Sequence, residues 1–146
     1  MKKLLMAALL AVVLTGSAFA KETSIVNSAV ATTFGYEFKK ASAVTWSTTT
    51  NYVKATFTLD NERMEAYYNY DGDKIGTSKA FNVEELPLGA KRALAKKYEG
   101  FTIKQAIEFA GIDETAYFIF AENEKESVIL KVNGTGGLST YKRTKK

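Results

Sequence analysis

The chain of 146 residues contains no cysteine and no histidine, and it has only one proline and one tryptophan. Without cysteine the chain must fold without disulfides, which for an exported protein is typical of a bacterial envelope. The absence of histidine excludes Ser-His-Asp and Cys-His catalysis and removes the commonest zinc ligand. There is also no Gly-x-Ser-x-Gly motif and no phosphate-binding loop. We therefore expect a protein that is not an enzyme and that uses no cofactor.

A hydrophobic run long enough to cross a membrane is also missing. The longest one, Leu4 to Leu14, has 11 residues, whereas a spanning helix needs about 20. Lys2 and Lys3 precede this run, and Ala18-Phe19-Ala20 follows it with the small residues of a signal-peptidase site. The pattern predicts a signal peptide over residues 1–20, cleaved after Ala20, and a periplasmic or secreted protein with no stable membrane insertion after cleavage. The alternative is a short membrane anchor that stays in place.

Neither positive nor negative charge is in large excess in this chain. The chain has 20 basic and 16 acidic side chains, and removal of Lys2 and Lys3 leaves a net charge of +2 for residues 21–146. This near-neutral balance, together with export, argues against a nucleic-acid partner. The last six residues carry four positive charges and are expected to form a solvated tail. The length of residues 21–146 predicts a single domain with its own core.

Two segments have the apolar period of a helix. Residues 25–41 carry one apolar stripe, and Thr23 or Ser24 is the expected N-cap. A second stripe starts at Leu86-Pro87 and ends at Gly100, which suits a helix C-terminus.

The remaining segments alternate with the period of strands. Four strands are predicted after each helix, at residues 43–50, 52–60, 63–70 and 74–81, and at 101–109, 115–121, 127–132 and 138–141. Turns are expected at Asn61-Glu62, Asp71-Gly72 and Asn133-Gly134. Within the fifth strand, one face is expected to hold Phe101, Ile103, Ile107 and Phe109.

The two halves of the chain have the same order of elements, as pseudo-repeats at about 24–82 and 84–143. A shift of 62 residues places Asp71-Gly72 on Asn133-Gly134 and Phe57 on Ile119. This indicates duplication of one supersecondary unit, and the alternative is chance similarity between amphipathic hairpins. The predicted fold is α+β, with two tandem helix-plus-antiparallel-meander units that form one antiparallel sheet with helices on one face.

Several motifs in this order resemble the PepSY-like family, whose members are similar to β-lactamase-inhibitor protein. The resemblance covers nearly all of residues 25–143 and depends on Phe34-x3-Phe38 before Trp46, Tyr52-x2-Ala55-x-Phe57, Ala66-Tyr67-Tyr68, Leu86-Pro87, Lys97-Tyr98-x-Gly100-Phe101-x-Ile103, Tyr117 and Gly136-Gly137-Leu138. It implies tandem α/β units in one sheet, export from Bacteroides-type bacteria and no catalytic residues. A likeness of fold does not carry over inhibition of a β-lactamase.

The sheet face away from the helices holds the candidate site. The set expected to face the helices is Val53, Phe57, Met64, Tyr68, Ile103, Ile119 and Leu130, and the set expected to face away is Tyr52, Tyr67, Phe118, Phe120, Ile129 and Tyr141, while Trp46 fits either. Contiguous exposed aromatics usually mark a binding surface. The candidate binding residues are Trp46, Tyr52, Tyr67, Phe118, Phe120 and Tyr141. Alternatively these side chains form cross-strand pairs, or the face is covered by a loop or by self-association.

Other acidic motifs are expected to be structural. Asn69-x-Asp71-x-Asp73 has alternating oxygens but lacks the ligand number of a Ca²⁺ loop, so we expect a hairpin turn and no metal. The pair Glu62 and Glu65, and the group Glu122, Glu124 and Glu126, are expected to be solvated rather than to act in acid–base catalysis.

The sequence thus predicts an exported, non-catalytic binding module for an unknown protein or peptide, held by the sheet face opposite the helices. The alternative is an envelope carrier of a small molecule or metabolite, with a pocket between sheet and helices. The oligomeric state is left open.

Overall fold

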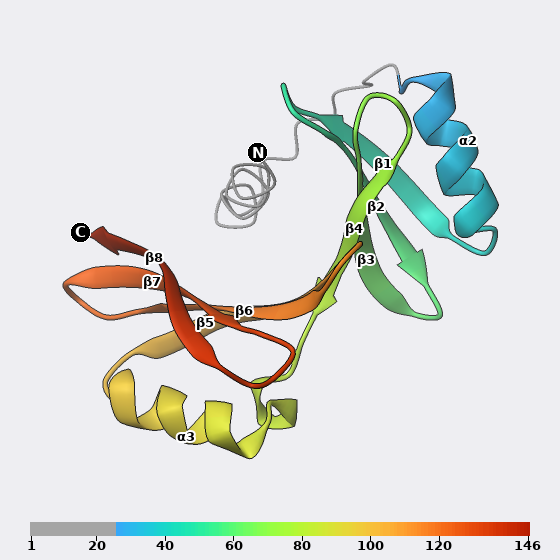
Figure 1. Ribbon diagram of the computed structural model, residues 1–146. Coiled ribbons are helices and arrows are strands. Elements are labelled where there is room, and N and C mark those ends of the chain that lie inside the picture. The colour runs from blue at the N-terminus through green and yellow to red at the C-terminus, as the bar shows by residue number, and fades with distance from the viewer. Residues whose placement is uncertain (1–25) are drawn as a thin grey trace.

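The computed structural model describes residues 26–146, so the predicted signal peptide and its cleavage site lie outside the described residues (Figure 1). The first half comprises helix α2 (Ser28–Glu37) and strands β1 (Ser42–Thr48), β2 (Val53–Leu59), β3 (Glu62–Tyr68) and β4 (Lys74–Ala80). The second half comprises a 3₁₀ turn η1 (Val83–Glu85), helix α3 (Leu88–Lys97) and strands β5 (Thr102–Gly111), β6 (Thr115–Glu122), β7 (Glu126–Val132) and β8 (Leu138–Lys145).

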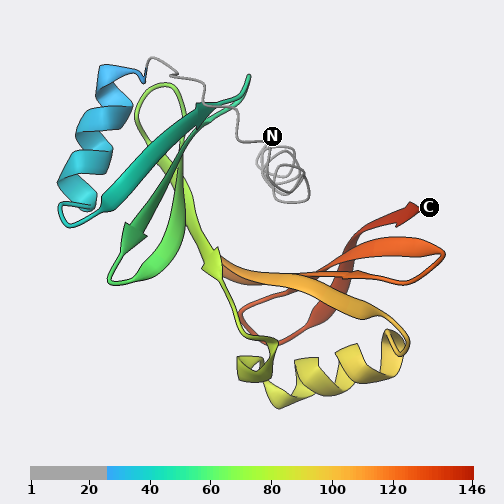
Figure 2. The ribbon, with the colours of Figure 1, turned by 180° about the vertical axis from the view of Figure 1, so that it is seen from behind.

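The described strands form one eight-stranded sheet in sequence order, and every neighbouring pair is antiparallel. Figures 1 and 2 show that the sheet bends between β4 and β5, with α2 on the outer side of the first half and α3 on the outer side of the second. The predicted α+β class and single antiparallel sheet with helices on one face are confirmed. Because of the bend, the sides of the two half-sheets away from the helices are turned toward each other.

The residue that precedes each helix favours the observed start of that helix. The Asn27 side chain accepts a hydrogen bond from the Ala29 amide at 2.7 Å, so α2 starts at Ser28 and the expected cap at Thr23 or Ser24 is wrong. The Asn27 Nδ2 also donates to the Tyr70 carbonyl at 2.7 Å, which ties the helix start to the β3–β4 turn. Pro87 precedes α3, where a missing N–H costs nothing.

The turns correct the predicted repeat. Asn69 Oδ1 accepts from the amides of Asp71 and Asp73, and Asn133 Oδ1 accepts from those of Thr135 and Gly137. Gly72 and Gly136 have φ of 93° and 86°, which favours glycine at both. Asn69 therefore corresponds to Asn133, a shift of 64 residues, and the predicted match of Asp71-Gly72 with Asn133-Gly134 is wrong.

The turn between β2 and β3 is displaced by one residue from the prediction. Asp60 and Asn61 have φ of 49° and 65° and form a two-residue turn between Leu59 and Glu62. The expected turn at Asn61-Glu62 is wrong because both left-handed positions fall one residue earlier.

The basic C-terminus is a strand rather than the expected solvated tail. β8 pairs with β7 from Leu138 opposite Val132 to Lys145 opposite Glu126. β8 is an edge strand, and its charged side chains are of the kind that blunt such an edge against pairing with other chains.

Three apolar clusters stabilise the sheet. The first lies beneath α2 and holds Val30, Phe34, Val53, Ala55, Phe57, Ala66 and Tyr68. The second lies beneath α3 and holds Leu86, Ala90, Ala106, Ile119, Ala121, Val128, Leu130 and Val132. The third lies on the opposite side of the sheet and is described in the next section.

An irregularity in β5 corrects the predicted faces of that strand. The register shifts between Ile103 and Gln105, so Ile103 pairs with Ala121 and Ile107 pairs with Phe118. Ala121 belongs to the cluster beneath α3, and Phe118 belongs to the opposite side. The expectation that Ile103 and Ile107 share a face is therefore wrong, because the extra residue reverses the alternation.

Candidate functional site

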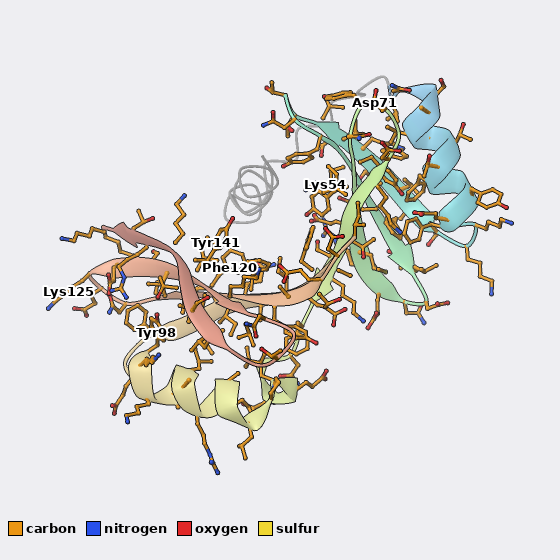
Figure 3. All side chains as sticks on the ribbon, in the orientation of Figure 1. Lys54, Asp71, Tyr98, Phe120, Lys125 and Tyr141 are labelled. Carbon is orange, nitrogen blue, oxygen red and sulfur yellow. The ribbon has the colours of Figure 1, made fainter. Side chains whose placement is uncertain are left out.

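The candidate site is the side of the sheet away from α2 and α3, which we call the far face. Its apolar cluster consists of Tyr52, Tyr67, Ile107, Phe109, Ala116, Phe118, Phe120 and Ile129, with Ile75 and Tyr141 packed against it. Five of the six predicted binding residues thus lie together: Tyr52, Tyr67, Phe118, Phe120 and Tyr141. In Figure 3, Phe120 and Tyr141 lie on the side of the second half-sheet away from α3.

The expected exposure of these aromatics is wrong for most of them. Tyr52, Tyr67, Phe118 and Phe120 are each at most 2% exposed, and only Tyr141 is partly accessible. The bend of the sheet and mutual ring contacts account for this burial. The Tyr67 ring lies 6.0 Å from that of Phe109 in the second half, and the Tyr141 ring lies 5.5 Å from that of Phe118. The far-face aromatics therefore form a core of their own.

Trp46, the sixth predicted residue, does not belong to the far face. It pairs with Ala55 in the cluster beneath α2, and its ring packs edge-on against Phe34 at 5.1 Å. Directly paired residues of neighbouring strands share a face, so the register assigns Trp46 to the helix side. Its inclusion among the candidate binding residues is therefore wrong, because Trp46 lies on the helix side of the sheet.

Polar groups form a partly buried network beside the aromatic cluster. The Tyr67 hydroxyl donates to Glu65 Oε2 at 2.5 Å and lies 3.3 Å from the Ser78 hydroxyl, which also donates to Glu65. Lys54 Nζ forms an ion pair with Glu65 Oε1 at 3.1 Å. Glu65 is therefore not the solvated carboxylate that was expected, and Glu62, three residues earlier in the strand, faces the other side.

The electrostatics of this network keep the tyrosines neutral. Burial raises the pKa of Tyr67 well above its usual range, and the neighbouring Glu65 carboxylate raises it further. Burial also raises the pKa of Tyr52, with a further increase from Glu65 and a partial offset from the Thr49 hydroxyl. Both phenols are consequently hydrogen-bond donors at any physiological pH.

Among residues 26–146, the buried Tyr52 hydroxyl finds no hydrogen-bond partner. The nearby Thr49 hydroxyl is engaged by the backbone, because it accepts from the Tyr52 amide at 3.2 Å and donates to the Tyr52 carbonyl at 3.3 Å. The Tyr67 ring packs edge-on against Tyr52 with centroids 5.7 Å apart, and its own hydroxyl points into the Glu65 network. An unpartnered buried polar group costs about 1–3 kcal/mol, so this hydroxyl stands out on the far face.

Lysines surround the aromatic cluster. The cross-strand partners of Tyr67, Phe118 and Ile129 are Lys54, Lys131 and Lys142, so all three lysines share the far face. Figure 3 shows Lys54 on the side of the first half-sheet away from α2. Sequence reasoning missed these lysines as a set, because the strand register was needed to bring them together.

The acidic motifs are engaged in hydrogen bonds and ion pairs. Asn69 Oδ1 is used by two backbone amides and Asn69 Nδ2 donates to Asp73 at 3.1 Å, as expected for a hairpin turn. Glu122 contacts Lys104 and Lys146, each at 3.0 Å, and Glu126 contacts Arg143 at 2.7 Å. Between residues 26 and 146, no group of three or more histidine, cysteine or acidic side chains is placed to hold a metal ion. Neither helix in this range is long and apolar enough to cross a membrane.

No protein-family model and no curated protein matches the chain. Solved structures with the same fold do match. A DUF2874 family protein from Bacteroides ovatus is 18% identical with a TM-score of 0.70, over 81% of this chain and 86% of that one. A BLIP-like protein from Bacteroides fragilis is 19% identical with a TM-score of 0.67, over 80% and 84%. A protein from Bacteroides eggerthii, described provisionally as periplasmic, is 11% identical with a TM-score of 0.70, over 81% and 87%. At these identities the likeness shows that the chain has the fold of BLIP-like proteins, and membership of the PepSY-like family stays a prediction.

Proposed function

We propose that the chain is an exported, non-catalytic binding module that holds a protein or peptide against its far face. The observation that carries this proposal is the third apolar cluster, which lies on the side of the sheet that neither described helix covers. A separate cluster in each half already joins helix and sheet, and the far-face cluster leaves Tyr141 partly accessible at its border. The fold likeness to a BLIP-like protein supports a binding role, and the periplasmic description of another neighbour supports export.

The accessible part of the far face would make the contact. Tyr141 is half-buried at the edge of the cluster, and Lys142 beside it is exposed. Tyrosine and the aliphatic part of lysine suit the border of an interface, where one end of the side chain is apolar and the other is in water. The buried rings of Phe118 and Phe120 would support this border from beneath rather than touch the partner first.

The carrier alternative gains no support from the helix-side packing. Beneath α2, the Phe34 ring lies 5.3, 5.1 and 5.0 Å from those of Phe38, Trp46 and Phe57. Beneath α3, Leu86 and Ala90 are buried against β6 and β7. These side chains occupy the space in which a ligand would have to lie.

The experiment is an affinity capture from envelope extract with two matched variants. The whole chain is exported from a bacterial host with a tag after Lys146, and its intact mass reports whether cleavage occurs after Ala20. Tyr141→Ala changes the far face, and Tyr36→Ala changes an α2 side chain that is 78% exposed. We expect a protein to be retained by the wild type and by Tyr36→Ala but released by Tyr141→Ala. Equal retention by both variants, with unchanged circular dichroism, would move the contact surface away from the far face.

A further inference from the structure

We propose that the partner of the far face is acidic: a polypeptide segment whose carboxylates meet the lysines of this face and whose oxygen accepts a hydrogen bond from the Tyr52 hydroxyl. The inference rests on the proposed function and adds the chemical class of the partner. It is carried by the register of three lysines and by one buried hydroxyl.

The lysines give the far face an excess of positive charge. Lys54 is paired with Glu65 at 3.1 Å and Lys131 with Glu114 at 2.5 Å, while Lys142 is exposed and forms no ion pair with any described residue. Elsewhere in the second half, one carboxylate, Glu122, is shared by Lys104 and Lys146. The pair of Lys54 and Glu65 belongs to the partly buried network, whereas Lys142 is exposed and is the lysine best placed to meet a partner directly. Like charges facing each other across an interface are costly, which selects a negative surface.

The hydroxyl of Tyr52 gives the site a second requirement. Tyr52 is 1% exposed, and its neutral hydroxyl has no acceptor in the part of the chain that the structure describes. The nearest carboxylate network is already occupied, because Glu65 accepts from Tyr67 and Ser78 and pairs with Lys54. A partner that supplies a carbonyl or carboxylate oxygen removes the cost of the unpartnered donor, and a partner without an acceptor does not. An acceptor-rich, negatively charged polypeptide meets both requirements.

Nucleic acid is also negative and rich in acceptors, but the aromatic rings argue against it. Proteins that bind single strands stack bases on accessible rings. Here Tyr67, Phe118 and Phe120 are at most 2% exposed and packed on one another. Of the aromatic rings of this cluster, Tyr141 alone is partly accessible, so the far face presents its lysines without a row of stacking platforms.

The test uses a defined probe, a fluorescein-labelled random copolymer of glutamate and tyrosine, with fluorescence anisotropy as the readout. The comparison probes are a copolymer of lysine and tyrosine and a single-stranded 16-nucleotide DNA. The protein is the chain as processed by the exporting host. We expect it to bind the glutamate copolymer at least tenfold more tightly than either comparison probe, with an affinity that falls as salt rises.

Two charge reversals on one strand localise the contact. Lys142 is opposite Ile129 on the far face, whereas Lys145 lies on the helix side, two residues beyond Arg143, the partner of Val128. We expect Lys142→Glu to weaken binding of the glutamate copolymer at least tenfold and Lys145→Glu to change it less than twofold. Tyr52→Phe keeps the ring and should weaken binding about three- to tenfold, the size of one net hydrogen bond.

The other outcomes contradict either the acidic partner or the proposed aromatic contact, and they can be told apart. Equal weakening by Lys142→Glu and Lys145→Glu would mean unspecific attraction to positive charge, and tighter binding of DNA would assign the lysines to nucleic acid. If the copolymer does not bind while Tyr141→Ala still abolishes capture of a protein, the partner is not acidic but the proposed function stands. If Tyr141→Ala leaves capture unchanged and Lys142→Glu still releases the copolymer, the acidic site exists without the proposed aromatic contact.

Discussion

Two substitutions of the same type on the far face should have opposite effects on stability. Tyr67→Phe removes a hydroxyl that donates to the Glu65 carboxylate at 2.5 Å, whereas Tyr52→Phe removes a hydroxyl that has no partner among the described residues. The two residues are 2% and 1% exposed, and their rings lie 5.7 Å apart. In both variants the ring remains, so neither creates a cavity. The difference between them isolates the hydrogen bond.

The expected magnitudes follow from the partners. A hydrogen bond to a charged acceptor contributes about 1.5–3 kcal/mol. Glu65 keeps its contacts with Lys54 at 3.1 Å and Ser78 at 3.3 Å, which compensate in part, so Tyr67→Phe should lower the free energy of unfolding by about 2 kcal/mol. Tyr52→Phe removes the cost of a buried unsatisfied donor and should leave the free energy of unfolding unchanged or raise it by about 1 kcal/mol.

The assay is equilibrium unfolding in urea, followed by circular dichroism and by the fluorescence of the single tryptophan, with the free energy extrapolated to water. The slope of the transition should be the same in all three proteins, because the surface exposed on unfolding hardly changes. A loss for Tyr52→Phe as large as that for Tyr67→Phe would show that the Tyr52 hydroxyl has an acceptor in the folded protein. That result would also remove the hydrogen-bond argument for an acidic partner.

Three further predictions concern packing and pH. A Cβ at Gly76 would lie 2.7 Å from the Ala110 carbonyl oxygen, so Gly76→Ala should destabilise the junction of the half-sheets by at least about 2 kcal/mol. Gly35 has open space around it, so Gly35→Ala should instead stabilise α2 by about 0.5–1 kcal/mol. Urea unfolding of the two variants measures both effects. Phe34→Ala should cost about 3–5 kcal/mol and alter Trp46 fluorescence, because Phe34 contacts three rings, while Tyr36→Ala on the same helix should stay within about 0.5 kcal/mol. In the folded protein, burial raises the pKa of both Tyr67 and Tyr68, and the neighbouring carboxylates of Glu65 and Glu37, respectively, raise it further. In the unfolded chain both tyrosines ionise near pH 10. The contribution of the two tyrosines to stability is therefore complete below about pH 10 and is lost as the pH rises further. Urea titrations at pH 9 and pH 11 should show this loss, and the loss should be smaller in Tyr68→Phe. An equal loss in wild type and variant would show that Tyr68 is not one of the groups responsible.

The division of residues between the two faces of the sheet was predictable, because strand alternation depends only on local order. The separation of Tyr52, Tyr67, Phe118 and Phe120 from Val53, Phe57, Ile119 and Leu130 matches the clusters of the structure. Alternation failed at β5, where one extra residue between Ile103 and Gln105 exchanges the faces. A bulge of this kind leaves no mark in the apolar pattern, since Ile103 and Ile107 are apolar on either side.

The exposure of the far face was not predictable from alternation, because it depends on the bend of the sheet. Alternation assigns a side chain to a face but does not say what covers that face. Tyr67 meets Phe109 only after β3, β4 and β5 are paired and the half-sheets turn toward each other. The same pairing brings Ser78 opposite Glu65, a contact between residues 13 positions apart.

The network around Glu65 was not predicted because the turn between β2 and β3 was placed one residue too late in the sequence. With the turn at Asp60–Asn61, Leu59 pairs with Glu62, and the register places Lys54 opposite Tyr67. A turn at Asn61-Glu62 would instead pair Asp60 with Arg63 and place Lys54 opposite Asn69. The hydrophobic pattern tolerates both registers, because they differ by two residues and keep every side chain on its face. The left-handed tendency of Asp and Asn was the signal that favours the observed turn.

The burial of the far-face aromatics changes which substitutions can reveal a partner. Replacing Tyr52, Tyr67 and Phe118 together with serine would remove three buried rings and unfold the chain before any contact was tested, since one aromatic truncated in a core costs about 3–5 kcal/mol. Apart from the one hydrogen bond proposed for Tyr52, binding energy on this face must therefore come from its accessible border, where Tyr141 and Lys142 lie side by side in β8. Such a border can be altered without loss of the core. If changing these two residues releases the partner while the unfolding transition stays in place, the release is due to the altered contact surface of the far face and not to unfolding of the protein.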